Sequence, residues 1–208
     1  MQETRSAPSI SRRLTPDQSS RERLLQAAIR VFECKGYAAA SVREIVELAG
    51  VTKPVLYYHF GSKQGLIVSI LEAAARDLRA VVEEAARTAG PTRERIVSVC
   101  QAVHRMVRQR TLELRVLHAV YYTAAALVPQ FDFEVFDRTL VSAFEHLVAD
   151  GIAAGELRRH APADATSAIL SVLMLALDLE VLGRTDRLDD AGLRRILDLV
   201  FDGICRHS

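Results

Sequence analysis

The sequence predicts an all-α protein of about nine helices. Apolar residues recur at spacings of three or four, and the alternation of apolar and polar residues that is typical of strands is missing. Glycine and proline fall at intervals that suit helix ends. Half of the 208 residues are apolar and only six are proline, so the chain can bury a sizeable core as one large domain or as a medium domain carrying a small one.

The N-terminal segment and the first helix differ sharply in pattern. Residues 1–18 are polar, aperiodic and contain two prolines, so we expect a flexible basic arm. A helix is predicted over about 20–35, because Ser19 and Glu22 form a capping-box pattern and Gly36 suits a C-cap.

Two short helices follow. Ser41 and Glu44 repeat the capping-box pattern and begin a second helix that ends at Gly50. Thr52 is a good N-cap for a third helix, which ends near His59. Beyond it the periodicity predicts a long fourth helix over about 62–88 and then further helices at about 92–109, 111–126, 133–153, 162–183 and 189–206.

Charge is divided unevenly along the chain. Residues 1–63 contain ten Lys and Arg against six Asp and Glu, whereas the remainder contains seventeen against twenty. A basic N-terminal part on a mildly acidic body suggests a polyanionic partner for the former only. All three lysines, Lys35, Lys53 and Lys63, lie in this part, where a compact charge suits a phosphate. Chance in a small count is the alternative.

The second and third helices form a helix-turn-helix pattern around an Ala-Gly-Val turn. Gly50 permits the turn, and Val51, Leu56 and Phe60 can point inward. The outward groups can reach phosphates, base edges or thymine methyl groups. They are Thr52, Lys53, Pro54, Tyr57, Tyr58 and His59. Lys63 and Ser41 begin helices, whose free backbone amides favour phosphate.

Four segments carry a resemblance to a known family. They are LxxAAxxxFxxxGY at 24–37, SVRxI at 41–45, AGVT at 49–52 and LYYHFxSKxxL at 56–66. This series resembles the DNA-binding domain of tetracycline-repressor-type (TetR/AcrR) regulators over roughly residues 20–66. Val46 and the pair Gln64-Gly65 depart from the usual residues, and the glycine is expected to weaken its helix by about 1 kcal/mol.

The resemblance implies an N-terminal three-helix DNA-binding domain over 19–65. The long fourth helix would join it to a C-terminal ligand-binding and dimerisation domain over 66–208. A homodimer would read a palindromic operator in double-stranded DNA, and a small-molecule effector would release it. By position, the implied DNA contacts are Ser41, Arg43, Thr52, Lys53, Pro54, Tyr57, Tyr58, His59 and Lys63.

Structural roles for some of these residues are the alternative. Tyr57 and Tyr58 could pack half-buried, His59 could act as a helix C-cap, and Arg43 could be a solvated charge. The flanking pattern favours DNA contact for Tyr57, Tyr58 and Lys63, and it leaves His59 and Arg43 open.

The body gives a weaker signal. Three apolar helix faces between residues 92 and 148 enclose either a solid core or a pocket in which polar groups orient a ligand. For each candidate, an ordinary buried or rim position is the alternative. The candidate ligand contacts are Cys100, Val103, His104, Val107, Leu117, His118, Tyr121, Tyr122 and Phe144.

The last two helices have apolar stripes rich in branched residues. Such a helical hairpin can pair with its copy as a four-helix bundle, so we expect a homodimer through 162–183 and 189–206. Burial inside the monomer is the alternative for each stripe.

Several classes of protein and site are disfavoured. Cys34, Cys100 and Cys205 are odd in number and widely spaced, as expected for free thiols in a reducing cytoplasm. The apolar stretch 168–177 is too short to span a bilayer. A metal site built around Cys100 and His104, and a redox sensor at Cys100, lack the usual spacing. We therefore expect a cytoplasmic protein without a cofactor.

The leading hypothesis is a one-component transcriptional regulator, a repressor rather than an activator or dual regulator, that responds to a small apolar ligand. A helical enzyme acting on an apolar molecule is the first alternative, although no nucleophile elbow, phosphate loop or dinucleotide fingerprint supports it. A helical adaptor that binds protein through its terminal helices is the second, and it leaves the basic first domain unexplained.

Overall fold

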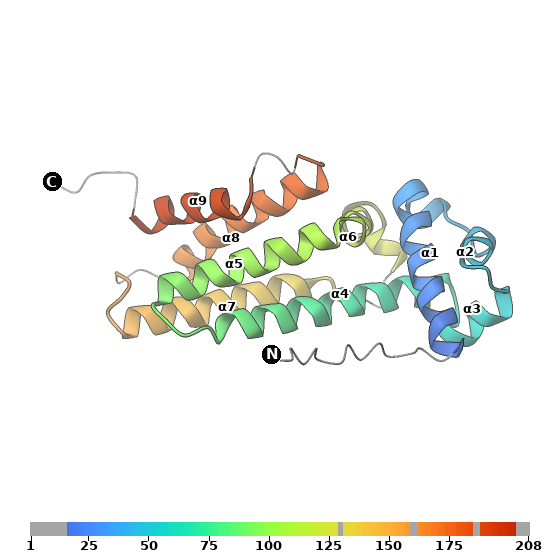
Figure 1. Cartoon of the computed structure of the whole chain (residues 1–208), viewed down its shortest axis with the longest axis horizontal. Coiled ribbons are helices and arrows are strands. Elements are labelled where there is room, and N and C mark those ends of the chain that lie inside the picture. The colour runs from blue at the N-terminus through green and yellow to red at the C-terminus, as the bar shows by residue number, and fades with distance from the viewer. Residues whose placement is uncertain (1–15, 129–130, 159–161, 185–187, 203–208) are drawn as a thin grey trace, which may run out of the picture.

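The N-terminal end of the chain forms three helices. In a computed structural model, which describes residues 16–128, 131–158, 162–184 and 188–202, α1 (Pro16–Ala39), α2 (Val42–Ala49) and α3 (Lys53–Phe60) gather at one end of the molecule (Figure 1). The helix α1 begins before Ser19, so the predicted capping box there is wrong. Of the expected arm, residues 1–15 lie outside the described residues and 16–18 belong to α1.

The ends of α2 agree with the capping pattern. The Ser41 side chain accepts a hydrogen bond from the Glu44 amide, and the Glu44 carboxylate accepts one from the Ser41 amide. Gly50 ends the helix in the left-handed conformation, at φ 63° and ψ 40°. Thr52 precedes α3 in an extended conformation, but its side chain makes no capping hydrogen bond, contrary to the prediction.

Most of the remaining helices lie along the length of the molecule (Figure 1). Within the described residues there are nine α-helices and no strand, which confirms the all-α prediction. The helices after α3 are α4 (Lys63–Ala86), α5 (Thr92–Gln109), α6 (Thr111–Ala124), α7 (Glu134–Ala153), α8 (Pro162–Val181) and α9 (Asp190–Asp202), with a short 3₁₀ turn, η1 (Ala125–Leu127), after α6.

Two apolar cores share α4. Leu66 and Leu71, in its first half, pack with α1, α2 and α3, whereas Leu78 and Val82 pack with α5, α7, α8 and α9. The helix α6 joins the first core, although it follows in the chain after α5. The N-terminal helices are therefore attached to the body through both α4 and α6.

Neither a membrane span nor a metal cluster is found in the part of the chain that the structure describes. None of its helices is long and apolar enough to cross a membrane. No group of three or more His, Cys, Asp or Glu side chains among the same residues is placed to hold a metal ion.

Candidate nucleic-acid interface

The helix α3 is fastened by one face and presents the other to solvent. Leu56 is fully buried and Phe60 is 8% exposed, both in the core shared with α1 and α2. On the opposite face, Tyr57 is 50% and Tyr58 is 78% exposed. This exposure contradicts the alternative in which Tyr58 packs half-buried, because most of its ring lies in water and contributes no buried apolar area.

The N-terminal end of α3 extends this surface. Thr52, Lys53 and Pro54 are all exposed. Hydroxyl, ammonium and aromatic groups are therefore gathered on one short helix, where phosphate oxygens can accept their hydrogen bonds and base edges can meet their rings. Half-buried Val51 packs beneath the turn.

The start of α2 is exposed beside its own ion pairs. Arg43 donates from Nε to Glu47 Oε1 at 2.7 Å, one turn along the helix. Lys35 forms an ion pair with Glu44, and together with the hydrogen bonds from Ser41 it lowers the pKa of the Glu44 carboxyl to about 2. The Ser41 hydroxyl is thus already engaged with Glu44.

His59 is held from the side by α1. Its Nε2 lies 3.0 Å from Ser20 Oγ, and the residue is half-buried. The C-terminal end of α3 is therefore tied to the N-terminal part of α1. This contact gives His59 a structural role that differs from the helix C-cap offered as the alternative by the sequence, and the DNA contact of His59 stays a prediction.

Lys63 differs from the prediction most clearly. Its Nζ donates to the carbonyl oxygens of Tyr37 at 2.9 Å, Ala38 at 3.3 Å and Ala40 at 2.8 Å. The ammonium also lies 4.7 Å from the centroid of the Tyr37 ring. Since an ammonium has three protons, all are used within the protein. Lys63 thus fastens α4 to the end of α1, and the phosphate contact expected for it stays a prediction.

The N-terminal helices match a described family. Residues 24–70 fit the sequence profile of "Bacterial regulatory proteins, tetR family". This segment of the chain is therefore a DNA-binding domain of the TetR family. The profile ends in the first half of α4, so it covers the helix-turn-helix and the helices that support it.

Two relatives extend the similarity to different extents. The chain is 41% identical over 87 residues to the HTH-type transcriptional activator FasR of Mycolicibacterium smegmatis, which covers 42% of this chain and 40% of FasR. It is 28% identical over 147 residues to the HTH-type transcriptional repressor KstR2 of the same organism, which covers 69% of this chain and 71% of KstR2. The chain thus spans less than half the length of FasR.

Solved structures share the fold over most of the chain. The TetR-family regulator PfmR of Thermus thermophilus superposes with a TM-score of 0.72 and 25% identity, covering 88% of this chain and all of PfmR. FadR of Bacillus subtilis, in complex with stearoyl-CoA, gives a TM-score of 0.71 at 16% identity and covers 88% of this chain and 99% of FadR.

Most of the ligand contacts predicted for the body lie in closed packing. Leu117 and His118 are half-buried on α6, and Tyr121 and Tyr122 are exposed there. Burial also raises the pKa of the Cys100 thiol to about 12, so this thiol is not a reactive thiolate. The fully or nearly fully buried members are Cys100, Val103, His104, Val107 and Phe144.

An open groove of about 1100 Å³ lies elsewhere, along α4 and α7. Of the nine predicted contacts only Tyr121 lines this groove, and the other eight stay predictions. Its floor includes the apolar Val82 and Leu147, and charged groups such as Arg79 and Arg138 form its rim. Sequence reasoning missed this groove because most of its lining residues are polar or charged residues of α4 and α7 that lie beside the apolar stripes.

Proposed function

We propose that this protein is a transcriptional regulator whose α3 helices enter the major groove of a palindromic operator. The observation that carries the proposal is the outward face of α3, on which Tyr57 and Tyr58 are exposed while Leu56 anchors the helix. Thr52, Lys53 and Pro54 lie at the end of the helix that would approach the bases first.

The sign of regulation proposed here is repression. A protein bound over a promoter excludes polymerase without needing a further contact surface. The repressor KstR2 covers the larger share of this chain, whereas the activator FasR is more similar over a shorter stretch. Activation from the same fold remains the alternative.

The DNA contact is tested by selecting bound sequences from a random library and measuring mobility shifts on the selected duplex. We expect a two-fold symmetric motif whose half-sites lie about one helical turn, or a multiple of it, apart. Tyr57→Ala should weaken binding by about 10-fold or more, because base and sugar contacts each contribute about 1–3 kcal/mol.

A matched control distinguishes a DNA contact by α3 from a general effect of removing one positive charge. Lys53→Ala should lower both the affinity and its salt dependence, whereas Arg79→Ala, in the groove of the body, should change neither. If Tyr57→Ala and Lys53→Ala bind as tightly as the unchanged protein, α3 is not the reading helix.

Dimerisation is proposed through α8 and α9. These two helices lie together on one side of the body (Figure 1) and carry large exposed apolar side chains. Exposed apolar groups on neighbouring helices favour pairing with the same surface of a second copy. They include Met174, Leu175, Leu199 and Val200. Leu175→Glu should convert a dimer into a monomer in light scattering, whereas Tyr122→Glu, on α6, should not.

The proposed effector is a molecule with a long apolar part that enters between α4 and α7. The groove there has an apolar floor, and α4 belongs to both cores, so a wedge at this place would move α3. Because FadR was solved with stearoyl-CoA, a long-chain acyl thioester is the first probe. It should weaken operator binding, and Ala143→Trp, at a half-buried position that lines the groove, should abolish that effect without weakening DNA binding itself.

A further inference from the structure

A pair of ionisable side chains lies buried in the body without an assigned role. His104 of α5 is fully buried, and Glu180, near the end of α8, is 1% exposed. Neither carboxylate oxygen of Glu180 has a hydrogen-bond partner, and the same holds for His104 Nε2 among the described residues. Buried ionisable groups are costly unless they are paired, so their arrangement needs a physical account.

The imidazole of His104 lies between two carboxylates. Its Nδ1 is 3.0 Å from Asp190 Oδ1, at the first residue of α9. Its Nε2 is 3.3 Å from Glu180 Oε1. A neutral imidazole has one N–H, so whichever nitrogen carries it, the other directs a lone pair at a carboxylate oxygen. Because His104 and Glu180 are shielded from water, this repulsion is removed when the two side chains together take up one more proton.

The outer charges favour ionised carboxylates. Arg108 Nε lies 3.5 Å from Glu180 Oε1, and Arg105 donates to Asp190 Oδ2 at 3.1 Å. Burial raises the pKa of Asp190, but hydrogen bonds from Arg105 and His104 outweigh it and the pKa is lowered overall. Both arginines come from α5, so α5 supplies the cations, while α8 and α9 supply one carboxylate each.

We propose that His104 and Glu180 hold one extra proton between them and act as a proton-sensitive link that ties α5 to both ends of the α8–α9 connection. In one arrangement the proton makes His104 an imidazolium, which donates hydrogen bonds to Glu180 and Asp190. In the other the proton stays on Glu180, which donates a hydrogen bond to His104 Nε2. Its loss leaves a buried carboxylate facing a lone pair, which loosens the end of α8.

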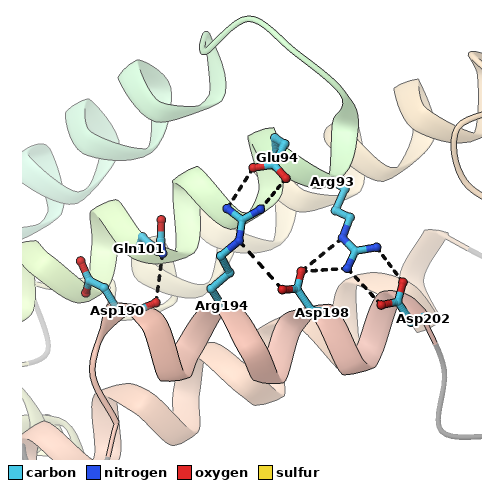
Figure 2. Close-up of polar contacts among 7 residues, drawn as sticks. All are labelled: Arg93, Glu94, Gln101, Asp190, Arg194, Asp198 and Asp202. Carbon is cyan, nitrogen blue, oxygen red and sulfur yellow. Dashed lines mark hydrogen bonds and ion pairs between the residues drawn. The ribbon is translucent and has the colours of Figure 1, made fainter.

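The rest of α9 is held by a different kind of contact. Figure 2 shows Arg194 paired with Glu94, and Arg93 paired with Asp198 and Asp202, in contacts that join α5 to α9. These groups are partly exposed and do not include the end of α8. The loosening is therefore confined to the α8 end and the first turn of α9. The regulatory consequence, a weaker dimer at higher pH, rests on the proposed role of α8 and α9.

The proton is counted from the pH dependence of stability. Urea unfolding of the full chain between pH 7 and pH 8.5 should show that folding takes up a proton. In the unfolded chain histidine is neutral and glutamate is ionised over this pH range, so the two side chains share no extra proton. The folding constant should then fall by up to 10-fold per pH unit. Glu180→Gln, whose amide can donate to a neutral imidazole, should flatten this dependence, and Asp178→Asn, exposed on the same helix, should keep it. Equal slopes for the unchanged protein and Glu180→Gln would overturn the proposal.

A second measurement does not depend on a variant that folds. In the unchanged protein at pH 8, ¹⁵N and ¹³C NMR should find either both ring nitrogens of His104 protonated or the Glu180 carboxyl protonated. A neutral His104 beside an ionised Glu180 would contradict the shared proton. Neither measurement involves DNA, so their failure would leave the proposed function untouched, and a failure to bind DNA would leave the shared proton untouched.

Discussion

The N-terminal helices and the body are built from similar helices but differ in how their polar residues are used. On α3, exposed Tyr57 and Tyr58 stand over a buried Leu56, so the residues with recognition chemistry face outward. In the body, His104 and Phe144 are fully buried, and an opening lies along α4 and α7 instead. A short helix at one end of the molecule has a free face, whereas α5 is surrounded by other helices. Aromatic rings therefore face solvent on α3, whereas in the body they fill the core.

The largest expected effect tests whether Phe144 is core or pocket. Phe144→Ala should lower the free energy of unfolding by about 3–5 kcal/mol, since a fully buried aromatic ring leaves a cavity. Tyr121→Ala, at the groove, should cost much less. Urea unfolding of both variants measures the difference. A Phe144→Ala protein as stable as the unchanged one would mean that this ring lines an open site.

At Gly65, helix propensity and side-chain packing predict opposite effects of a substitution by alanine on stability. Helix propensity alone predicts that Gly65→Ala gains about 1 kcal/mol. A Cβ at this position would lie 2.0 Å from the Phe60 carbonyl oxygen, which is backbone and cannot move away cheaply. We therefore expect Gly65→Ala to lower the free energy of unfolding by about 1–3 kcal/mol.

A control on the same helix calibrates this comparison. Ala80→Gly, at an exposed position of α4, should lose about 1 kcal/mol from propensity alone. A thermal unfolding midpoint that rises for Gly65→Ala would show that α3 and α4 meet less tightly than the carbonyl contact requires.

Lys53, the first residue of α3, and Lys63, the first residue of α4, give opposite expectations. Lys63→Met should lower the free energy of unfolding by about 1–3 kcal/mol, because three carbonyl oxygens lose their donor. Lys53→Met, at an exposed position, should leave stability unchanged and weaken DNA binding. Unfolding and mobility-shift measurements on both variants check this. If Lys63→Met keeps its stability and loses only affinity, Lys63 is a phosphate contact after all.

The smallest effect concerns the capping box of α2 in acid. The pKa of Glu44 is lowered from 4.5 to about 2 by its bonds with Lys35 and Ser41, so its stabilising contribution is present above pH 4.5 and is lost as the pH falls through about 2. The difference in stability between the unchanged protein and Glu44→Gln should therefore shrink over that range. Glu47→Gln, on the exposed side of α2, is the control. A difference that stays constant down to pH 2 would contradict the capping role.

Much of the fold followed from neighbouring residues along the chain. The capping box of α2, the left-handed Gly50 and the helices over 92–109 and 162–181 agree with the sequence pattern within a few residues. Helix periods and caps depend on groups three or four positions apart, which the sequence displays directly. The prediction failed at Ser19, because the helix already begins at Pro16 although residues 16–18 show no apolar period.

The candidate sites also differ in whether they depend on neighbouring residues or on residues far apart in the chain. The helix-turn-helix and the outward face of α3 could be predicted from the residues alone, because an eight-residue helix with two apolar anchors leaves little choice of orientation. The folded arrangement was needed to show that Lys63 meets carbonyl groups about 25 residues away, and that His104 meets Asp190 across 86 residues. These contacts depend on how whole helices cross, and helix crossing is set by packing over many side chains at once. The buried charges and the groove are consequences of that packing.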